Sequence, residues 1–546
     1  MSAPPVLEIE NLHVRLPAGA ERPYAVEDAS YALAPGEILC VVGESGSGKS
    51  LTARAVMGLL PAPYVAYERG VIRFGGEDLT KASPARMRAV RGGEISMIFQ
   101  EPMTALNPVM RVGRQIDEVI RFHANLPRRR RRARAIELVE DVQLPDPERM
   151  LRAYPHELSG GQRQRAMIAM ALAMEPKVLI ADEPTTALDV TTQAQILALI
   201  KALQAKHDTG VLFITHDFGV VADIADRVAV MQHGRIVEID AATRVLNAPS
   251  HPYTRGLIAA VPSLVPRPAR APSGEAVLDV RNLSKTYAGG KAWFGLGGTT
   301  RAVRAVDDVS ITLDAGETLG IVGESGSGKS TLARCIVRLV DAEAGEIRYR
   351  GTALRPLARA AMRPYRAKVQ MVFQDPFASL NPRSRVGRIV ADGPIVLGES
   401  RAVAESRARE MLELVGLDGG AFERFPHEFS GGQRQRIGVA RALALRPEIL
   451  VADEPVSALD VSVQAQVLEL LARIRDELQL SMVFITHDLR VAAQVCDRIA
   501  VMRLGKVVEQ GDTAALFERA AHPYTRELIE AVPGRHWTSP ALVENG

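Results

Sequence analysis

The sequence predicts an α/β fold in which helices cover a parallel sheet, and it predicts that fold twice along the chain. Short apolar runs such as GEILCVVG, KVLIADE and GVLFITHD end in glycine or acidic residues and alternate with longer stretches of helical length. Such runs are typical of buried parallel strands. The same series returns in the second half as GETLGIVG, EILVADE and SMVFITHD. Alternating strands and helices indicate the α/β class.

The composition is that of a core-forming protein. Of 546 residues, 47% are apolar and 24% charged, which excludes a disordered, collagen-like or coiled-coil chain. The net charge of +3 gives no global reason to expect nucleic acid or acidic lipid as a partner. The three cysteines lie far apart, which predicts no disulfide framework or cysteine metal cluster and indicates a reducing compartment.

We expect no membrane-spanning helix and no secretory signal. The first residues lack a basic region followed by an apolar one. The longest apolar run, Ala166–Met174, has nine residues, whereas a membrane span needs about 20.

A tandem duplication sets the expected domain boundaries. LSGGQRQR returns as FSGGQRQR, and ADEPTTALD as ADEPVSALD, both 271 residues later. A period this long indicates two whole domains, which we expect at 1–262 and 277–546. The stretch 263–276 is rich in Pro, Ala and Arg without a hydrophobic period, which predicts a semi-extended linker. The stretches 101–157 and 375–428 lack the strand pattern and are expected to be inserted, mainly helical subdomains.

A phosphate-binding loop is predicted in each copy. GESGSGKS fits G-x-x-x-x-G-K-[ST], follows a predicted strand and opens a predicted helix. Its glycines permit positive φ, so that successive N–H groups converge on phosphate oxygens at a helix N-terminus. Lys49 and Lys329 are expected to reach the β- and γ-phosphates, and the Ser50 and Ser330 hydroxyls to ligate Mg²⁺. The expected ATP-binding residues here are Gly43, Glu44, Ser45, Gly46, Ser47, Gly48, Lys49, Ser50, Leu51, Gly323, Glu324, Ser325, Gly326, Ser327, Gly328, Lys329, Ser330 and Thr331.

An acidic pair ends one strand of each copy. Asp182 and Asp453 are expected to hold Mg²⁺ through water. Glu183 and Glu454 are expected to polarise the attacking water. A simple helix cap is the alternative, but a phosphate loop precedes the pair in both copies.

Two further polar side chains follow apolar runs in each copy. Gln100 and Gln374 lie at the junction with the helical insert, where a glutamine can touch Mg²⁺ or the water and sense the γ-phosphate. His216 and His487 end the last apolar strand and are expected to hydrogen-bond the γ-phosphate. A single strand-end histidine is more often structural, but its repetition in FITHD favours the functional interpretation.

A second anion site is predicted where SGGQ precedes a helix beginning RQR. Its hydroxyl, backbone N–H groups and helix dipole suit a phosphate. Because each copy already has a phosphate loop, the economical source of that phosphate is the ATP bound on the other copy. We therefore expect two composite sites, to which these segments contribute Ser159, Gly160, Gly161, Gln162, Ser430, Gly431, Gly432 and Gln433.

These motifs, in this order and twice, resemble the ATP-binding cassette (ABC) ATPases of membrane transporters. The resemblance covers nearly all of both halves and implies two P-loop NTPase domains, each with a RecA-like parallel-sheet core and an inserted helical subdomain. FQEPMTALNP, FQDPFASLNP and the HPYTR at both domain ends look more narrowly like the oligopeptide/dipeptide/nickel importer branch. Two ATPases that are usually separate subunits are here fused, as in microcin C–type peptide importers.

The resemblance implies an activity and a set of partners. It implies ATP hydrolysis, with ATP and Mg²⁺, that drives uptake of peptides or peptide-like solutes. The implied partners are two transmembrane permeases, expected to be different chains because the inserts differ, and an extracytoplasmic solute-binding protein, with no nucleic acid. It implies a peripheral protein at the cytoplasmic face of the cell membrane. Peptide, glutathione, nickel chelate and peptide antibiotic are all left open as the solute.

The chain departs from the branch in two ways. Many members bind an iron–sulfur cluster through cysteines after HPYT, but neither Ser263–Ala276 nor Gly534–Gly546 contains a cysteine, so we expect no such cluster. The family also stacks adenine on an aromatic residue after the first strand. Tyr287 in LSKTY fits that role, whereas the first copy offers Leu16, unless the nearby Tyr24 reaches the base.

Other features receive less specific interpretations. Arg128–Arg132 is a run of arginines without interleaved aromatics, which favours a solvated helix face over nucleic-acid binding. Contact with lipid headgroups or with a permease loop is a third option. His251 and His522 of HPYT are assigned to capping or packing, with no chemistry. The rival function is a soluble twin-cassette ATPase acting on ribosomes or nucleic acid, but such proteins generally carry a long charged helical linker.

Overall fold

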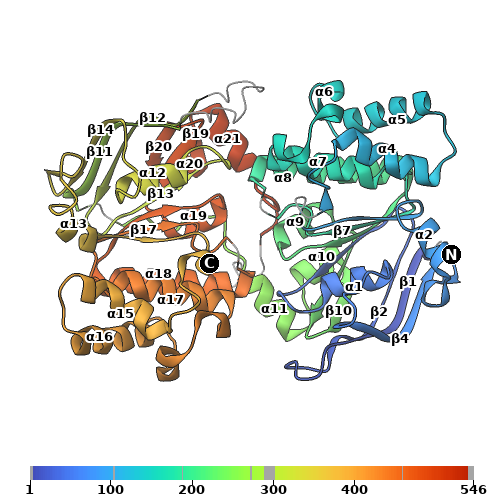
Figure 1. Ribbon diagram of the computed structural model, residues 1–546, viewed down its shortest axis with the longest axis horizontal. Helices are drawn as coiled ribbons and strands as arrows, with labels where there is room; N and C mark the ends of the chain where they lie inside the picture. The colour runs from blue at the N-terminus through green and yellow to red at the C-terminus, as the bar shows by residue number, and fades with distance from the viewer. Residues whose placement is uncertain are drawn as a thin grey trace. The chain divides into compact units, whose positions relative to one another are not determined.

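The computed structural model describes residues 4–101, 105–186, 188–270, 273–287, 302–457 and 459–538. The chain divides into two compact units, one formed by Met1–Val261 with Val532–Gly546 and the other by Pro262–Ala531. Each unit has its own sheets, helices and core (Figure 1).

The first unit contains two sheets. An antiparallel sheet has the order β2-β1-β4-β5, and a six-stranded sheet has the order β10-β9-β3-β8-β7-β6. Strands β6, β7, β8, β3 and β9 are parallel, and only β10 runs against its neighbour. The strands are β1 (Leu7–Arg15), β2 (Tyr24–Leu33), β3 (Ile38–Val42), β4 (Ala66–Phe74), β5 (Glu77–Asp78), β6 (Ile95–Ile98), β7 (Val178–Asp182), β8 (Gly210–Ile214), β9 (Arg227–Gln232) and β10 (Arg235–Ala241).

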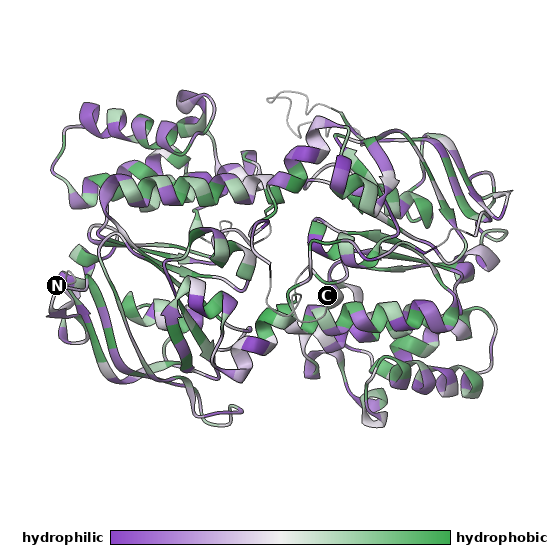
Figure 2. Cartoon of the chain, turned by 180° about the vertical axis from the view of Figure 1, so that it is seen from behind, coloured by the Kyte–Doolittle hydropathy of each residue, from purple (hydrophilic) through white to green (hydrophobic). Residues whose placement is uncertain are grey.

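The central strand β3 is buried on both faces, as its unbroken apolar sequence predicts. Cys40 and Val42 face a core shared with the helices, whereas Leu39 and Val41 face a core shared with the antiparallel sheet. This alternation follows from the two-residue period of a strand. Packing on both faces holds the carboxyl end of β3 in place, and the phosphate loop begins there. Figure 2 shows the strands of this sheet coloured mostly as hydrophobic.

The helices of the first unit cover the six-stranded sheet and build the insert. Within 101–157 every described element is helical, from α4 to α6 and a short 3₁₀ turn. At the start of α5 the guanidinium of Arg131 contacts Asp117 at 2.7 Å, and that of Arg132 contacts Glu148 at 2.7 Å. The helices are α1 (Lys49–Val56), α2 (Pro84–Val90), α4 (Val112–His123), α5 (Arg128–Asp141), α6 (Pro147–Arg152), α7 (Gly160–Ala171), α8 (Val190–His207), α9 (Phe218–Ile224), α10 (Ala242–Asn247) and α11 (Pro252–Ala259).

The second unit repeats this topology. Its sheets have the orders β12-β11-β14-β15 and β16-β17-β18-β13-β19-β20, with only β20 antiparallel in the larger one. The strands are β11 (Ala276–Tyr287), β12 (Val303–Asp314), β13 (Thr318–Val322), β14 (Ala344–Tyr349), β15 (Thr352–Ala353), β16 (Val369–Val372), β17 (Ile449–Asp453), β18 (Ser481–Ile485), β19 (Arg498–Arg503) and β20 (Lys506–Asp512).

Its helices also follow the first unit in order, and the described elements of its insert are all helical. The helices are α12 (Lys329–Ile336), α13 (Arg363–Lys368), α14 (Pro376–Ser379), α15 (Val386–Val396), α16 (Arg401–Leu414), α17 (Gly431–Leu443), α18 (Val461–Leu478), α19 (Leu489–Val495), α20 (Thr513–Arg519) and α21 (Pro523–Glu530). No helix among the described residues is long and apolar enough to cross a membrane.

The segment after α11, expected as a linker at 263–276, belongs to the second unit. There the backbone N–H of Arg267 donates to Ala493 O at 3.1 Å. The guanidinium of Arg270 donates to Asp497 at 3.0 Å, a charge-assisted bond of the stronger kind. Because its arginines meet acceptors, this segment is held against the unit along the residues described. Positions 271 and 272 lie outside them.

The segment after α21 groups with the first compact unit. The duplicated sequence leads us to expect it in the second domain, 277–546. The Gly534 N–H donates to Asp223 Oδ2 at 2.9 Å. Trp537 packs against the helix-side core of the first unit. The segments that follow α11 and α21 are therefore both held by contacts between residues far apart in the sequence. Local sequence patterns do not reveal such contacts.

Candidate functional site

The two phosphate loops have the same backbone shape. In the first unit the loop joins β3 to α1, with φ of 148° at Gly43, 75° at Gly46 and 109° at Gly48. In the second unit Gly323, Gly326 and Gly328 have φ of 147°, 80° and 105°. These values favour glycine. A Cβ on Gly43 would also lie 2.1 Å from Met231 O, so that position requires glycine for space as well.

The loop lysines are buried against the loops that they follow. Lys49 Nζ donates to Gly43 O at 2.7 Å and to Glu44 O at 2.9 Å. Lys329 Nζ makes the same pair of bonds in its own loop, at 2.7 and 2.9 Å. Both lysines are 5% exposed. Each ammonium group therefore lies inside the curve of its loop, where it can meet an anion.

The serine after each lysine contacts the aspartate that ends a neighbouring strand. Ser50 Oγ donates to Asp182 Oδ1 at 2.8 Å, and Ser330 Oγ donates to Asp453 Oδ1 at 3.0 Å. Burial raises the pKa of Asp182 and of Asp453, although the serine bond and the nearby lysine act to lower it. A cation beside these buried oxygens would lower both pKa values, so the donor set suits a hard divalent ion.

The glutamate, glutamine and histidine predicted from separate segments meet in each unit. Gln100 Nε2 donates to Glu183 Oε2 at 2.8 Å, and His216 Nδ1 lies 3.5 Å from Glu183 Oε1. In the second unit Gln374 Nε2 donates to Glu454 Oε2 at 2.8 Å, and His487 Nδ1 lies 3.2 Å from Glu454 Oε2. Adjacent parallel strands bring these residues together, because their carboxyl ends meet at one edge of the sheet.

Both glutamates have unusual backbone conformations. Glu183 has φ of 47° and Glu454 has φ of 46°, in the left-handed region that non-glycine residues rarely adopt. Such strain concentrates at functional sites. Burial acts to raise the pKa of each glutamate, but the hydrogen bond and charge of the neighbouring histidine outweigh it, so that the pKa is lowered. Both side chains are therefore carboxylates at neutral pH.

The SGGQ segments begin long helices through reciprocal caps. Ser159 Oγ accepts the Gln162 N–H at 3.3 Å, and Gln162 Oε1 accepts the Ser159 N–H at 3.1 Å. Ser430 and Gln433 form the same capping box at the start of α17. A Cβ on Gly161 would lie 2.8 Å from Thr192 Cγ2 of α8, so glycine permits close packing there. The segment thus presents an ordered helix N-terminus in each unit, at partly exposed residues.

The two units differ at the edges where adenine stacking is expected. Tyr287 is the last residue of β11 and is 42% exposed. Leu16 follows β1 and packs, partly buried, against the core of the first unit. Tyr24 OH donates to Glu68 Oε1 at 2.9 Å, and its ring lies edge-on to His13. The Tyr24 hydroxyl is therefore engaged within its own sheet.

Sequence reasoning missed a contact of the HPYT tyrosines. Tyr253 OH accepts the Glu44 N–H at 3.2 Å, and Tyr524 OH accepts the Glu324 N–H at 3.2 Å. The histidine of HPYT acts as the helix cap expected of it, since His251 Nδ1 accepts the Tyr253 N–H at 3.2 Å. The available signal was the recurrence of HPYT at the same 271-residue offset as SGGQ, ADEP and FITHD.

The chain matches two known protein families. The ABC transporter family matches residues 26–186 and 306–457, which contain both phosphate loops and both acidic pairs. The C-terminal region of oligopeptide/dipeptide transporters matches residues 237–291 and 508–541, which contain both HPYT segments.

Individual relatives match along nearly the whole chain. A protein of Agrobacterium fabrum described as the peptidoglycan transport ATP-binding protein YejF is 47% identical over 96% of this chain and 96% of its own length. The glutathione import ATP-binding protein GsiA of Escherichia coli O157:H7 is 47% identical over 97% of this chain and 89% of its own length. GsiA of Salmonella choleraesuis is likewise 47% identical. With two matched nucleotide-binding modules and these relatives, the chain belongs to the ABC transporter family as an ATP-binding protein that hydrolyses ATP.

Proposed function

We propose that this chain is the ATPase subunit of an importer for peptides or peptide-like solutes. The observation that carries the proposal is the 47% identity, over almost the full chain, to ATP-binding proteins described for peptidoglycan transport and for glutathione import. Glutathione is a short peptide and peptidoglycan contains peptide chains, so a short peptide is the chemistry that these names share. The rival function on ribosomes or nucleic acid has no support from these relatives.

Within each cassette the residues divide the work. Lys49 and Lys329 leave the loop carbonyls to bind ATP phosphates, and the loop N–H groups bind the phosphate oxygens. Glu183 and Glu454, held as carboxylates, orient and polarise the attacking water. Gln100, Gln374, His216 and His487 hold these glutamates and contact the γ-phosphate.

The same sites suit Mg²⁺ bound with the nucleotide. Ser50 with Asp182, and Ser330 with Asp453, place oxygen donors within one hydrogen bond of each other, with Gln100 and Gln374 as further ligands. When bound, the ion supplies charge compensation for the phosphate oxygens. The serine and aspartate side chains orient that ion, and the glutamates act on the water.

Hydrolysis takes place at two composite sites, each pairing one phosphate loop with the SGGQ segment of the other cassette. Two features support this. Each cassette has its own phosphate loop and a second, separate helix N-terminus suited to a phosphate. Each also has a complete set of Lys, Asp, Glu, Gln and His, so both sites are expected to be hydrolytic.

The helical inserts are the contact for two permease chains at the cytoplasmic face of the membrane. Each insert begins directly after Gln100 or Gln374, so movement of the glutamine on ATP binding can move the insert. In the second insert Phe377 is 64% exposed beside Arg434, as a docking residue would be. In the first, Met103 lies outside the described residues. A solute-binding protein supplies the substrate to the permeases.

Reconstitution tests the function. The chain is reconstituted in lipid vesicles with the permeases and the solute-binding protein encoded by genes beside its own. Uptake of labelled di- and oligopeptides and of glutathione is then measured. We expect ATP-dependent peptide uptake that is abolished by Glu183→Gln with Glu454→Gln. Cysteines at Met103 and Phe377 should crosslink to permease loops. Crosslinking to ribosomal protein or RNA instead would refute the importer function.

A further inference from the structure

The last helix of each cassette contacts the first turn of the phosphate loop in the same unit. Tyr253 OH accepts the Glu44 N–H at 3.2 Å and donates to Glu44 Oε2 at 3.3 Å. Tyr524 OH accepts the Glu324 N–H at 3.2 Å. The two contacts join residues about two hundred positions apart, and they occur once in each unit. The contact is therefore common to both copies of the duplicated module.

The residues around each tyrosine aim its hydroxyl at the loop. On β10, Glu238 accepts the backbone N–H groups of Ser250 and His251 at 2.7 and 3.1 Å. His251 Nδ1 then caps α11 by accepting the Tyr253 N–H. Pro at the first helical position favours the start of a helix there.

The second unit builds the same support from Glu509, which accepts the N–H groups of Ala521 and His522 at 2.7 and 3.2 Å. His522 Nδ1 accepts the Tyr524 N–H at 3.1 Å. The Tyr524 ring is 1% exposed and lies 4.5 Å from the Arg503 guanidinium.

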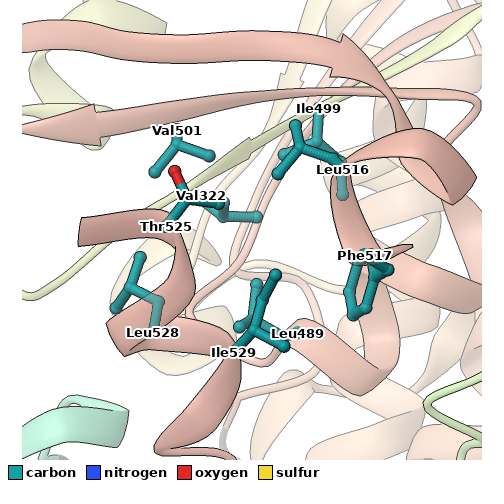
Figure 3. A pocket seen from close by; sticks show the side chains of 9 residues that line it. All are labelled: Val322, Leu489, Ile499, Val501, Leu516, Phe517, Thr525, Leu528 and Ile529. Carbon is teal, nitrogen blue, oxygen red and sulfur yellow. The ribbon is translucent and has the colours of Figure 1, made fainter. Parts of the chain in front are cut away.

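The helices that carry these tyrosines, α11 and α21, pack against apolar residues of their own units. Figure 3 shows Leu528 and Ile529 of α21 facing Leu489 of α19 and Leu516 of α20 around a small apolar hollow. In the first unit Leu257 and Ile258 of α11 lie in the same core as α9 and α10. A hydroxyl on such a support stays in place when the loop changes partners.

The loop needs a partner of this kind when nucleotide binds. Gly43 O and Glu44 O are held by Lys49 Nζ. Once that ammonium group turns to the phosphates, those two bonds are lost. The tyrosine bond does not involve the lysine, and it therefore persists at the point where the loop leaves β3.

We propose that Tyr253 and Tyr524 are positioning residues that hold the first turn of each phosphate loop in its nucleotide-binding shape. The HPYT segment then has a role for each of its first three residues. Histidine caps the helix, proline begins it, and tyrosine fixes the loop. This inference rests on the proposed ATP sites.

Tyr253→Phe and Tyr524→Phe in the full-length chain test the proposal, because phenylalanine keeps the ring and removes only the hydroxyl. Tyr31→Phe is the matched control, since the buried Tyr31 hydroxyl of the first unit has no hydrogen-bond partner. ATP binding, the KM for ATP, kcat and the melting temperature without nucleotide are measured for each variant.

A lost hydrogen bond at the loop should weaken ATP binding and raise KM about two- to tenfold. We expect kcat and the nucleotide-free melting temperature to stay close to those of the wild type, and Tyr31→Phe to change neither KM nor binding. Unchanged ATP affinity in both variants would overturn the proposal. So would a fall in the nucleotide-free melting temperature that accounts for the whole loss of affinity. Failure of the wild type itself to bind ATP would instead refute the proposed sites.

Discussion

The two cassettes agree closely where phosphate chemistry is expected and differ where the base is expected. Ser–Asp, Gln–Glu and Lys–carbonyl distances in the two units differ by no more than a few tenths of an ångström. At the base-binding edge, however, one cassette offers Tyr287 and the other offers Leu16. The residues that position the phosphates and the attacking water tolerate little displacement. At the base, an apolar contact can replace a stacked ring, and only nucleotide affinity is then lowered. Equal catalysis with unequal nucleotide affinity is the expected result.

The largest effect should come from the glutamates that the two cassettes share. Glu183→Gln or Glu454→Gln should lower the turnover of its own site by about 10²–10⁴, because the amide cannot polarise the attacking water. The double variant should bind ATP and retain it. Phosphate release, measured beside an exposed Glu137→Gln control, checks this. If Glu454→Gln abolished activity and Glu183→Gln left it intact, the equivalence of the two cassettes would be wrong.

The base-binding edges should give the next largest effect. Tyr287 can stack on adenine and Leu16 cannot, a difference of about 1–3 kcal/mol in nucleotide affinity. Leu16→Tyr should therefore tighten the first site, and Tyr287→Leu should weaken the second. Site-resolved ATP titration measures both. Tyr24→Leu serves as the control, and a loss at the first site as large as that of Tyr287→Leu would show that Tyr24 holds the base.

The sequence predicted the repeated α/β topology and the residues that meet at the sheet edge. It could do so because strand ends carry short motifs, and because the carboxyl ends of parallel strands converge. It could not predict the Tyr253 contact with Glu44, which depends on how a distant helix packs against the first strand–helix turn. For the same reason it could not show that the residues after α21 group with the first compact unit, since only long-range packing brings Trp537 to the first core.

That assignment gives a smaller, steric prediction. A Cβ on Gly219 of α9 would lie 2.5 Å from Pro533 O, whereas one on Gly256 of α11 would meet nothing within 4 Å. Gly219→Ala should therefore displace the segment around Trp537 and destabilise the first unit by about 1–2 kcal/mol. Gly256→Ala should be neutral or stabilising, because alanine is the better helix former. Trp537 fluorescence in a Trp293→Phe background reports the displacement, and equal spectra for both variants would contradict it.

The smallest difference expected between the cassettes lies in their histidine–glutamate pairs, which are 3.2 Å long in the second unit and 3.5 Å in the first. Burial acts to lower the pKa of His487, but the bond and charge of Glu454, with the charge of Asp488, outweigh it and raise the pKa above the usual 6.5. The stabilisation from this pair should thus be fully present below pH 6.5 and be lost as the pH rises through the raised value. Glu454 stays ionised throughout this window, because its own pKa is lowered. Because the pair is partly exposed, the loss should be below about 1 kcal/mol.

His487→Gln should lower the melting temperature at pH 6 and do so less at pH 8. A difference from the wild type that grew with pH would reverse the sign and refute the raised pKa.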